Sequence, residues 1–268
     1  MELNIDYISD LHLTHYISKK ESITKIDKLV QDKISMQVKG DILVVAGDID
    51  EDINRVSELL YSCSKYYKKV IFVLGNHEYY IPVIKYIYTD PMAKEYNYNS
   101  MNKVYRLNEI FKDNNDITIL DKTNNTKGIY TYNTFLLAGD TLWYKPVTLV
   151  DKLYNYPMQN DSRFILSELS KKDKIQKLHN DSISWYNNLP NNIDLMITHV
   201  PPFRNKSNSR GNNSCYYTEV KEYKSPVWIY GHDHKEEDII INNTRLVSNP
   251  WGYDTKDFKI KTLTLTKE

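Results

Sequence analysis

Five short apolar runs in this chain, each with the composition of a buried strand, end directly in polar residues that can bind metals or move protons. The clearest run, Val70 to Leu74, is followed by Gly75-Asn76-His77-Glu78. After the other four runs come Asp10-Leu11-His12, Gly47-Asp48, His199, and Gly231-His232-Asp233-His234. The carboxyl ends of the strands in an open α/β sheet are where ligands collect. We therefore expect an α/β protein whose site is built from strand ends.

The first third of the chain alternates strands with helices. Apolar residues at helical spacing predict helices over residues 22–36, with Ser22 as its cap, and over residues 52–68, with an acidic start and a basic end. These segments separate the strands expected at 4–9, 41–46 and 70–74. The strand–helix–strand order predicts neighbouring strands whose ends meet at one edge.

The rest of the chain predicts further strands and two longer helices. The strands are expected at 117–120, 129–132, 134–138, 194–198, 227–230, 239–242, 245–247 and 260–265, and the helices near 101–112 and 171–188. A tight turn at Asn133 predicts a hairpin, so antiparallel pairing should give one mixed sheet or two sheets. We expect one domain over residues 1–268, with insertions near 79–115 and 145–190.

Composition argues against several classes of protein, although nucleic acid remains a possible partner that is not favoured. Thirty-five basic residues balance 35 acidic ones, which gives no general attraction to nucleic acid or to an anionic membrane. Neither a leader peptide nor a long apolar run is evident, and two cysteines are too few for a disulfide framework. These features predict a cytoplasmic protein without a membrane segment.

The residue types after the strands favour metal binding. In extended chain Asp10 and His12 point the same way, so one cation could take both. The ionised carboxylate of Asp48 after a buried strand needs a positive charge nearby. Five of the seven histidines lie in these blocks. Imidazole with carboxylate suits manganese, iron or zinc better than calcium or magnesium, and the lack of a cysteine ligand argues against a structural zinc.

Taken together and in order, Asp-x-His, Gly-Asp, Gly-Asn-His-Glu, a lone His and Gly-His-x-His resemble the calcineurin-like metallophosphoesterase superfamily. The resemblance spans residues 10–234. It implies a four-layer α/β/β/α sandwich of two mixed sheets flanked by helices. It also implies two divalent ions per chain, with manganese favoured over iron, zinc or nickel.

The resemblance implies a role for each motif residue. Asp10, His12, Asp48 and His234 would bind the first ion. The second ion would be bound by Asp48, Asn76, His199 and His232, so that Asp48 bridges the two. The nucleophile would be a hydroxide between the ions, and His77 would protonate the leaving group. Glu78 would orient His77 or cap the loop, and is not counted as catalytic.

The expected activity is hydrolysis of small or nucleotide-like phosphomonoesters or phosphodiesters. A nuclease of the same fold and a non-catalytic metal-binding scaffold are the alternatives. A protein Ser/Thr phosphatase is disfavoured, because Ile49-Asp50-Glu51-Asp52 follows Gly47-Asp48 where that family carries Val-Asp-Arg-Gly.

Several other residues have open roles. Trp143, in a Gly-x-Thr-Leu-Trp turn of one branch of the superfamily, could line a pocket or plug the core. Trp251 stands where that branch would be expected to carry arginine, which puts a phosphate contact there in doubt. The loop 203–224 could bring cationic groups such as Arg210 over the site or remain solvated. His179 is expected to be structural or exposed.

Overall fold

The computed structural model describes residues 1–18, 24–82, 90–206, 209–253 and 258–267. Within them the strands are β1 (Glu2–Ile8), β2 (Ile42–Ala46), β3 (Lys69–Val73), β4 (Ile117–Leu120), β5 (Ile129–Tyr132), β6 (Phe135–Asp140), β7 (Leu195–Thr198), β8 (Val227–Tyr230), β9 (Glu237–Ile241), β10 (Thr244–Ser248) and β11 (Lys261–Thr266). Every strand expected from the apolar runs is present, with ends shifted by two residues at most.

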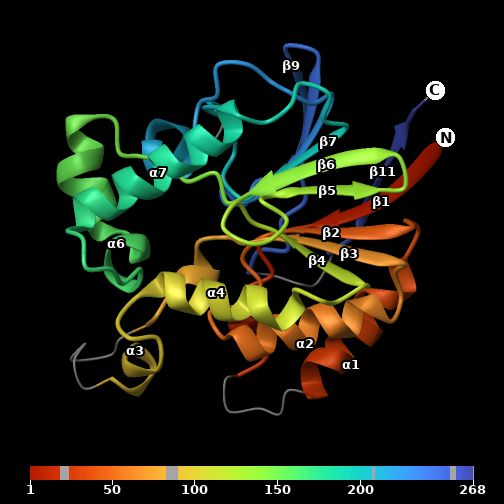
Figure 1. Cartoon of the computed structure of the whole chain (residues 1–268), viewed down its shortest axis with the longest axis horizontal. Coiled ribbons are helices and arrows are strands. Elements are labelled where there is room, and N and C mark those ends of the chain that lie inside the picture. Colours follow the sequence, from red (N-terminus) through yellow and green to blue (C-terminus); the bar gives the residue numbers. More distant parts are fainter. Residues whose placement is uncertain (19–23, 83–89, 207–208, 254–257, 268) are drawn as a thin grey trace.

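In these described residues, the first sheet has five strands in the order β11-β1-β2-β3-β4. Strands β1 to β4 are parallel, and β11 runs antiparallel to β1. The two ends of the chain therefore lie side by side (Figure 1). The βαβ connections bring the carboxyl ends of β1, β2 and β3 to one edge.

The second sheet has six strands in the described residues, in the order β5-β6-β7-β8-β10-β9. The expected hairpin is present, since β5 and β6 pair antiparallel through a turn in which Asn133 has φ 54°. The predicted mixed pairing is confirmed as well, although the sequence did not show which strands run parallel. Strands β6, β7, β8 and β10 pair parallel, and antiparallel pairing is confined to the two edges. The segments between β6, β7 and β8 are long enough for crossovers.

The helices of the described residues are α1 (Thr24–Lys33), α2 (Ile53–Ser64), α3 (Pro91–Glu95), α4 (Ser100–Phe111), α5 (Tyr156–Met158, after a π-helical turn over Asp151–Asn155), α6 (Asn160–Phe164) and α7 (Lys171–Asn187). Helix α2 begins as predicted, because the Asp52 side chain accepts a hydrogen bond from Asn54 N. No basic residue lies in its last turn, so the expected basic end is wrong. Ser22, the cap expected for α1, lies outside the described residues.

Two packed sheets with helices outside them form four layers, which confirms the expected α/β/β/α sandwich (Figure 1). The alternate side chains of β2 show how the first sheet packs between the helices and the second sheet. Leu43 and Val45 pack with α1, α2 and α4, whereas Ile42, Val44 and Ala46 pack against the second sheet. A strand buried on both faces must be apolar throughout. On the far side of the second sheet, Tyr186 of α7 packs on residues of β6, β7 and β8.

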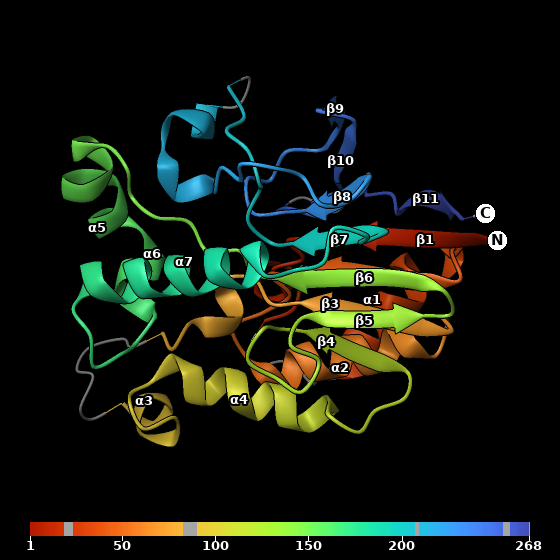
Figure 2. The same cartoon turned by 45° about the horizontal axis from the view of Figure 1, so that its top comes forward.

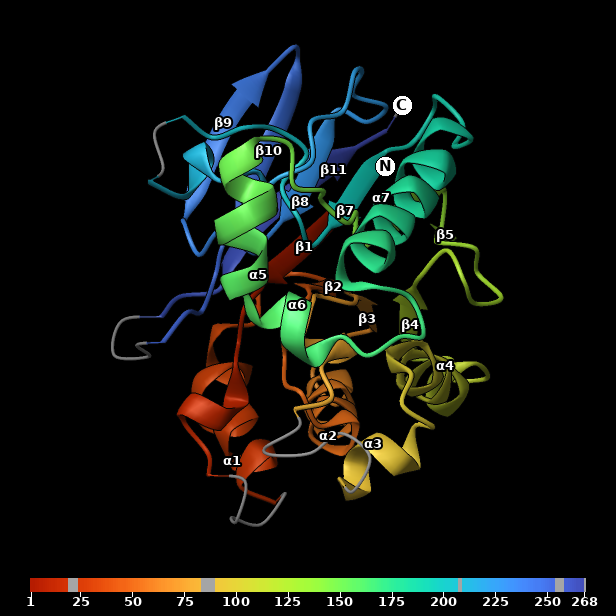
Figure 3. The ribbon, with the colours of Figure 1, turned by 90° about the vertical axis from the view of Figure 1, so that its left-hand side faces the viewer.

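The α5–α6 part of the segment 145–190 lies beyond the carboxyl ends of the parallel strands, whereas α7 packs on the second sheet (Figure 2). Figure 2 shows α5 and α6 on that side, and Figure 3 views the molecule from there, with both helices in front of the strand ends. The α5–α6 part therefore stands at the edge where the motif residues were expected. Among the described residues, no helix combines the length and the apolar character needed to cross a membrane.

Candidate metal centre

The side chains singled out in the sequence converge at one edge of the two sheets. Asp10 and His12 follow β1, Asp48 follows β2, and Asn76 and His77 follow β3. From the second sheet, His199 follows β7, and His232 and His234 follow β8. All eight therefore leave the ends of neighbouring parallel strands, as the apolar runs predicted.

Two motif glycines allow the loops to come together. A Cβ atom on Gly47, whose φ is 86°, would overlap the imidazole of His199. A Cβ atom on Gly75 would lie 2.5 Å from Asp48 N and would also overlap the Asp48 carboxylate. Only glycine fits these places, because the site side chains occupy the space that any other residue would need.

The backbone of the site is held in an unusual conformation. Asp10, His12, Asp48, His232 and His234 all have positive φ, between 44° and 72°. Asp and His are the residue types that tolerate this region better than most. Such conformations persist only where the surrounding structure imposes them, and they cluster at functional sites.

Three side chains form the first of two adjacent clusters of possible metal ligands. Atoms of Asp10, His12 and His234 lie within 4.8 Å of one another. His234 Nε2 is 3.3 Å from Asp10 Oδ1 and 3.1 Å from His12 Nε2. Asp10 also accepts a hydrogen bond from the backbone N–H of His232, at 3.0 Å.

The second cluster joins Asp48, His199 and His232, again within 4.8 Å. Asn76 Oδ1 lies 2.9 Å from His199 Nε2 and 3.1 Å from His232 Nδ1. Asp48 Oδ2 is 3.3 Å from His199 Nε2 and 3.8 Å from His12 Nε2, so its carboxylate lies between the clusters. Several ligand atoms thus face one another closely, and a cation between them would suit this donor set.

Hydrogen bonds fix which nitrogen each imidazole presents. His199 Nδ1 lies 2.8 Å from the carbonyl oxygen of Ala46, and His232 Nε2 lies 3.1 Å from that of Cys215. If these nitrogens donate, His199 Nε2 and His232 Nδ1 are left facing the cluster, the arrangement that orients metal-binding histidines elsewhere.

The pKa values of the imidazoles differ with their charged neighbours. Burial lowers the pKa of His12 and of His232 to about 4. Burial also opposes the charging of His199, but Asp48 beside it outweighs this and raises the pKa of His199 to about 10. His12 and His232 are therefore neutral near pH 7, the form that binds a metal.

His77 lies beside His12 and Asp48, lines the cavity and is partly exposed. Its Nε2 is 3.8 Å from Asp48 Oδ2, and its Nδ1 is 3.5 Å from Glu51 Oε1. Burial works against a charge here, yet the charges of Asp48 and Glu51 raise the pKa of His77 to about 9. His77 also falls in a ligand group with His12 and Asp48, so its distance alone does not separate a proton donor from a ligand.

Glu78 ties the loops after β2 and β3 together. Its fully buried carboxylate accepts hydrogen bonds from the backbone N–H groups of Asp48, Ile49, Asp50 and Gly75. Of the two roles considered from the sequence, the structure shows the loop cap. Burial and the charge of Asp48 raise the pKa of Glu78 to about 7.

The clusters open into a cavity of about 480 Å³. Motif residues form one wall, and the opposite wall comes from the α5–α6 segment and the loop after β7: Tyr154, Asn155, Met158, Gln159, Asn160, Arg210, Asn213 and Tyr216. Of the two possibilities left open for this loop, the first applies to Arg210, which lines the cavity with its guanidinium 5.0 Å from the Tyr216 ring and Nη1 3.4 Å from the carbonyl oxygen of His232.

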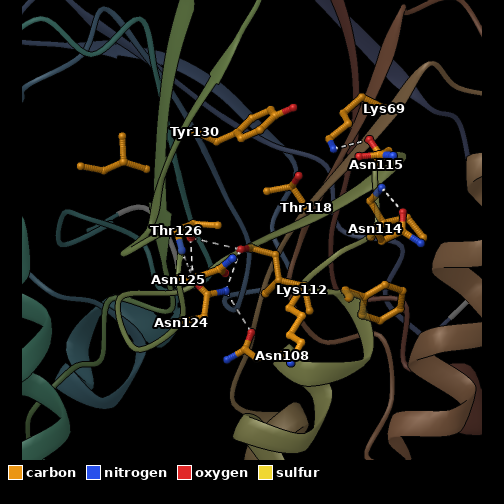
Figure 4. A pocket seen from close by; sticks show the side chains of 14 residues that line it. Lys69, Asn108, Lys112, Asn114, Asn115, Thr118, Asn124, Asn125, Thr126 and Tyr130 are labelled. Atoms are coloured by element: carbon orange, nitrogen blue, oxygen red, sulfur yellow. Dashed lines mark hydrogen bonds between the residues drawn. The ribbon is translucent and has the colours of Figure 1, made fainter.

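Another cavity, of about 370 Å³, lies away from the motif residues (Figure 4). Five asparagines and two lysines line it, together with threonines and apolar or aromatic side chains, and it contains neither histidine nor carboxylate. This donor set does not suit a transition metal. Of these two cavities, the one at the strand ends therefore has the side chains that suit a metal site.

Three residues with open roles prove to be structural. Trp143 is fully buried and makes an edge contact with Tyr79, so it plugs the core and does not line the cavity. Trp251 is also buried and stacks on Phe258. His179 is buried, with Nδ1 2.8 Å from the carbonyl oxygen of Trp143.

Comparison with known proteins agrees with this arrangement. The family model described as calcineurin-like phosphoesterase matches residues 3–236, which is most of the chain. The chain belongs to the calcineurin-like phosphoesterase family. The expected superfamily is thereby confirmed. Several groups of histidine and aspartate in the described part of this chain could hold a metal ion.

Two relatives of this phosphoesterase are similar over nearly their whole length. The uncharacterized protein L509 of Acanthamoeba polyphaga mimivirus is 24% identical over 275 residues, covering 92% of this chain and 90% of that protein. The crystal structure of the phosphopantetheinyl hydrolase of Mycobacterium tuberculosis superposes with a TM-score of 0.63 at 17% identity, covering 93% of this chain and 89% of that one. At such low identity the second likeness shows the shared fold.

Several residues of the site had no signal in the sequence. Tyr80 and Tyr216 line the cavity, but they are two of 23 tyrosines and belong to none of the motifs. Asp161 was not singled out either, although its buried carboxylate accepts a hydrogen bond from Asn76.

Proposed function

We propose that this phosphoesterase hydrolyses phosphomonoesters or phosphodiesters with two divalent metal ions, manganese being favoured. One observation carries the proposal. The clusters of Asp10, His12 and His234 and of Asp48, His199 and His232 meet at the Asp48 carboxylate, and the site opens into a cavity. Imidazole and carboxylate in this proportion suit manganese, iron, zinc or nickel.

Each cluster would hold one ion. Asp10, His12 and His234 would bind the first, Asn76, His199 and His232 the second, and Asp48 would bind both. Ions held by these residues would supply Lewis acidity, which lowers the pKa of a bound water and offsets charge on phosphoryl oxygens. The residues of the chain orient these ligands: Glu78 holds the backbone of Asp48, and the carbonyl of Ala46 holds the ring of His199.

His77 and Arg210 would act on the substrate itself. His77 lies beside Asp48 at the cavity wall and would give its proton to the leaving oxygen, an effect of roughly 10² to 10⁴ in rate. Arg210 faces the cavity from the opposite wall, where a guanidinium could pair with phosphoryl oxygens. The substrate would thus lie between a wall of metal ligands and a wall that carries one arginine.

The size and lining of the cavity support a small substrate. About 480 Å³ is the size of a typical small-molecule site. We infer that residues 1–268 act as one domain and that the segment 145–190 is an insertion whose α5–α6 part closes the cavity. A nuclease acting on long nucleic acid is less well supported, because the net charge of the chain is zero.

The test combines metal analysis with a substrate panel. The purified protein is loaded with Mn²⁺, and its activity is measured on aryl phosphates, aryl phosphodiesters, cyclic nucleotides and single-stranded DNA. We expect about two ions per chain and hydrolysis of at least one small ester. In Asp48→Asn both ions and the activity should be lost, because an amide cannot offset the repulsion between two cations.

A matched control is Asp121→Asn. Asp121 is also buried directly after a strand of the first sheet, but its partners are Asn108 and Thr123 and it lies in neither cluster. This variant should keep both ions. Two bound ions without hydrolysis of any ester would favour the scaffold. Cleavage of DNA alone would favour the nuclease.

A further inference from the structure

A buried carboxylate in the α5–α6 segment stands directly behind the second cluster. Asp161 is 1% exposed, and Asn76 Nδ2 donates to its Oδ1 at 2.9 Å. The hydroxyl of Tyr80 donates to the same oxygen, and the hydroxyl of Tyr144 donates to Oδ2. Three donors, two from the loop after β3 and one from the segment after β6, therefore meet on one side chain that is in none of the ligand clusters of the described residues.

These hydrogen bonds determine which way the Asn76 amide faces. A carboxylate only accepts, so the Tyr80 hydroxyl must use its one proton to donate a hydrogen bond to Asp161. The oxygen of Tyr80 is then free to accept, and Asn76 Nδ2 donates to it at 2.7 Å. With both acceptors on the side of Nδ2, the Asn76 carbonyl oxygen is left facing His199 and His232.

Without Asp161 the opposite orientation would be favoured. The Tyr80 proton would be free to bond Asn76 Oδ1, and Nδ2 would turn toward His199 Nε2 and His232 Nδ1. An amide NH₂ between two imidazole nitrogens makes good hydrogen bonds, but it offers no lone pair to a cation and occupies the lone pairs of both rings. The orientation in which Asn76 Oδ1 faces the cation is therefore the one that needs support from neighbouring residues.

We propose that Asp161 is a positioning residue. By accepting the hydrogen bond of the Tyr80 hydroxyl, it keeps Asn76 Oδ1 facing the second metal ion. This inference rests on the proposed metal site. The segment 145–190 would then have a second role besides closing the cavity, because the Asp161 carboxylate belongs to α6. Tyr144 extends the same support, because its ring lies nearly parallel to that of His232, with centroids 6.0 Å apart.

The test is a double-mutant cycle on Asp161→Ala and Tyr80→Phe, read by metal binding. Calorimetry gives the stoichiometry and the dissociation constants of Mn²⁺, and thermal unfolding of the metal-free proteins checks the fold. Asp161→Ala should bind the first ion normally and the second roughly 10- to 100-fold more weakly, the usual effect of losing support behind a ligand. Tyr80→Phe alone should bind both ions, because Asp161 still accepts from Asn76 Nδ2.

The double variant separates positioning from mere packing. With no tyrosine proton to stabilise the reversed amide, Asp161→Ala/Tyr80→Phe should bind the second ion roughly three-fold or more tightly than Asp161→Ala. If Asp161 only packs the segment, the second substitution should leave the affinity unchanged or weaken it further, and that result overturns the inference. So does a wild-type affinity in Asp161→Ala.

Two further comparisons keep the test decisive. If Asp161→Ala unfolds, Asp161→Leu fills the same space without an acceptor, and the same two outcomes apply. A wild-type protein that binds no second ion would instead refute the proposed metal centre, because the positioning role predicts a difference between variants of a protein that binds two.

Discussion

Gly75→Ala should disrupt the metal centre through a steric effect that the structure allows us to estimate. The added Cβ would lie 2.5 Å from Asp48 N, whereas real Cβ contacts below 3.0 Å essentially never occur. The loops after β2 and β3 must therefore separate by at least 0.5 Å, the difference between 3.0 and 2.5 Å. Rotation of the Asp48 side chain cannot relieve this overlap, because the atom concerned belongs to the backbone.

The displacement is large on the scale of metal binding. Ligand distances in metal sites are held within roughly 0.2 Å, so a shift of Asp48 by half an ångström should weaken both ions. Overpacking of a tight interior costs about 1 to 3 kcal/mol, and we expect the upper end here. For a chain of this size that corresponds to a melting temperature lower by roughly 6 to 12 °C.

The assays are thermal unfolding of the metal-free protein and calorimetric binding of Mn²⁺. Gly252→Ala is the matched control, since Gly252 has a φ of 71° and only open space where its Cβ would lie. It should cost only about 1 kcal/mol of backbone strain and should leave both ions bound. The reasoning would be refuted if Gly75→Ala kept the stability and the Mn²⁺ affinities of Gly252→Ala.

Other substitutions and metal removal test the remaining parts of the site. The pKa of Glu78 is raised from 4.5 to about 7 in the folded protein. The free energy of unfolding of the metal-free protein, relative to that of Glu78→Gln, should therefore fall as pH rises from 4.5 to 7. A difference between the two unfolding free energies that does not change with pH would contradict this. In His77→Ala both ions should remain, and turnover should fall more on alkyl than on p-nitrophenyl esters, since a good leaving group needs little protonation; equal losses would argue against a proton donor. Arg210→Ala should raise KM roughly ten-fold, because it removes a charged hydrogen bond to the substrate. Arg204→Ala in the same loop should leave KM unchanged. Initial-rate kinetics on any ester that the enzyme accepts would test both expectations. Removal of the ions by a chelator should lower the melting temperature, because Mn²⁺ at 100 times its dissociation constant stabilises the fold by about 2.7 kcal/mol per site; an unchanged melting temperature would mean that the folded chain holds no ions.

The parts predicted well from sequence are those with local causes. A strand buried on both faces must be apolar along its whole length, so β2, β3 and β7 were recognisable from composition alone. Asp48 and His199 stood out because polar residues directly after such runs are uncommon without a function. Their meeting at one edge then follows from the parallel direction of the strands.

Strand direction in the second sheet was harder to predict. The hairpin of β5 and β6 had a local signal at Asn133, but the pairing of β6 with β7 depends on a crossover of more than 50 residues. Short-range patterns do not record whether such a segment returns the chain parallel or antiparallel. The sequence therefore predicted the hairpin and a mixed pairing, but not the parallel pairing of β6, β7, β8 and β10.

The order of residues was enough to specify the strands, the layers and the set of strand-end side chains that would hold the metals. What faces those side chains was decided by packing alone. Asp161 lies 85 residues from Asn76 along the chain, and Arg210 reaches the cavity from a loop whose local sequence resembles solvated surface. Contacts of this kind depend on how α6 and the loop after β7 fold back over the strand ends, which is a property of the packed chain and leaves no periodic trace in its sequence.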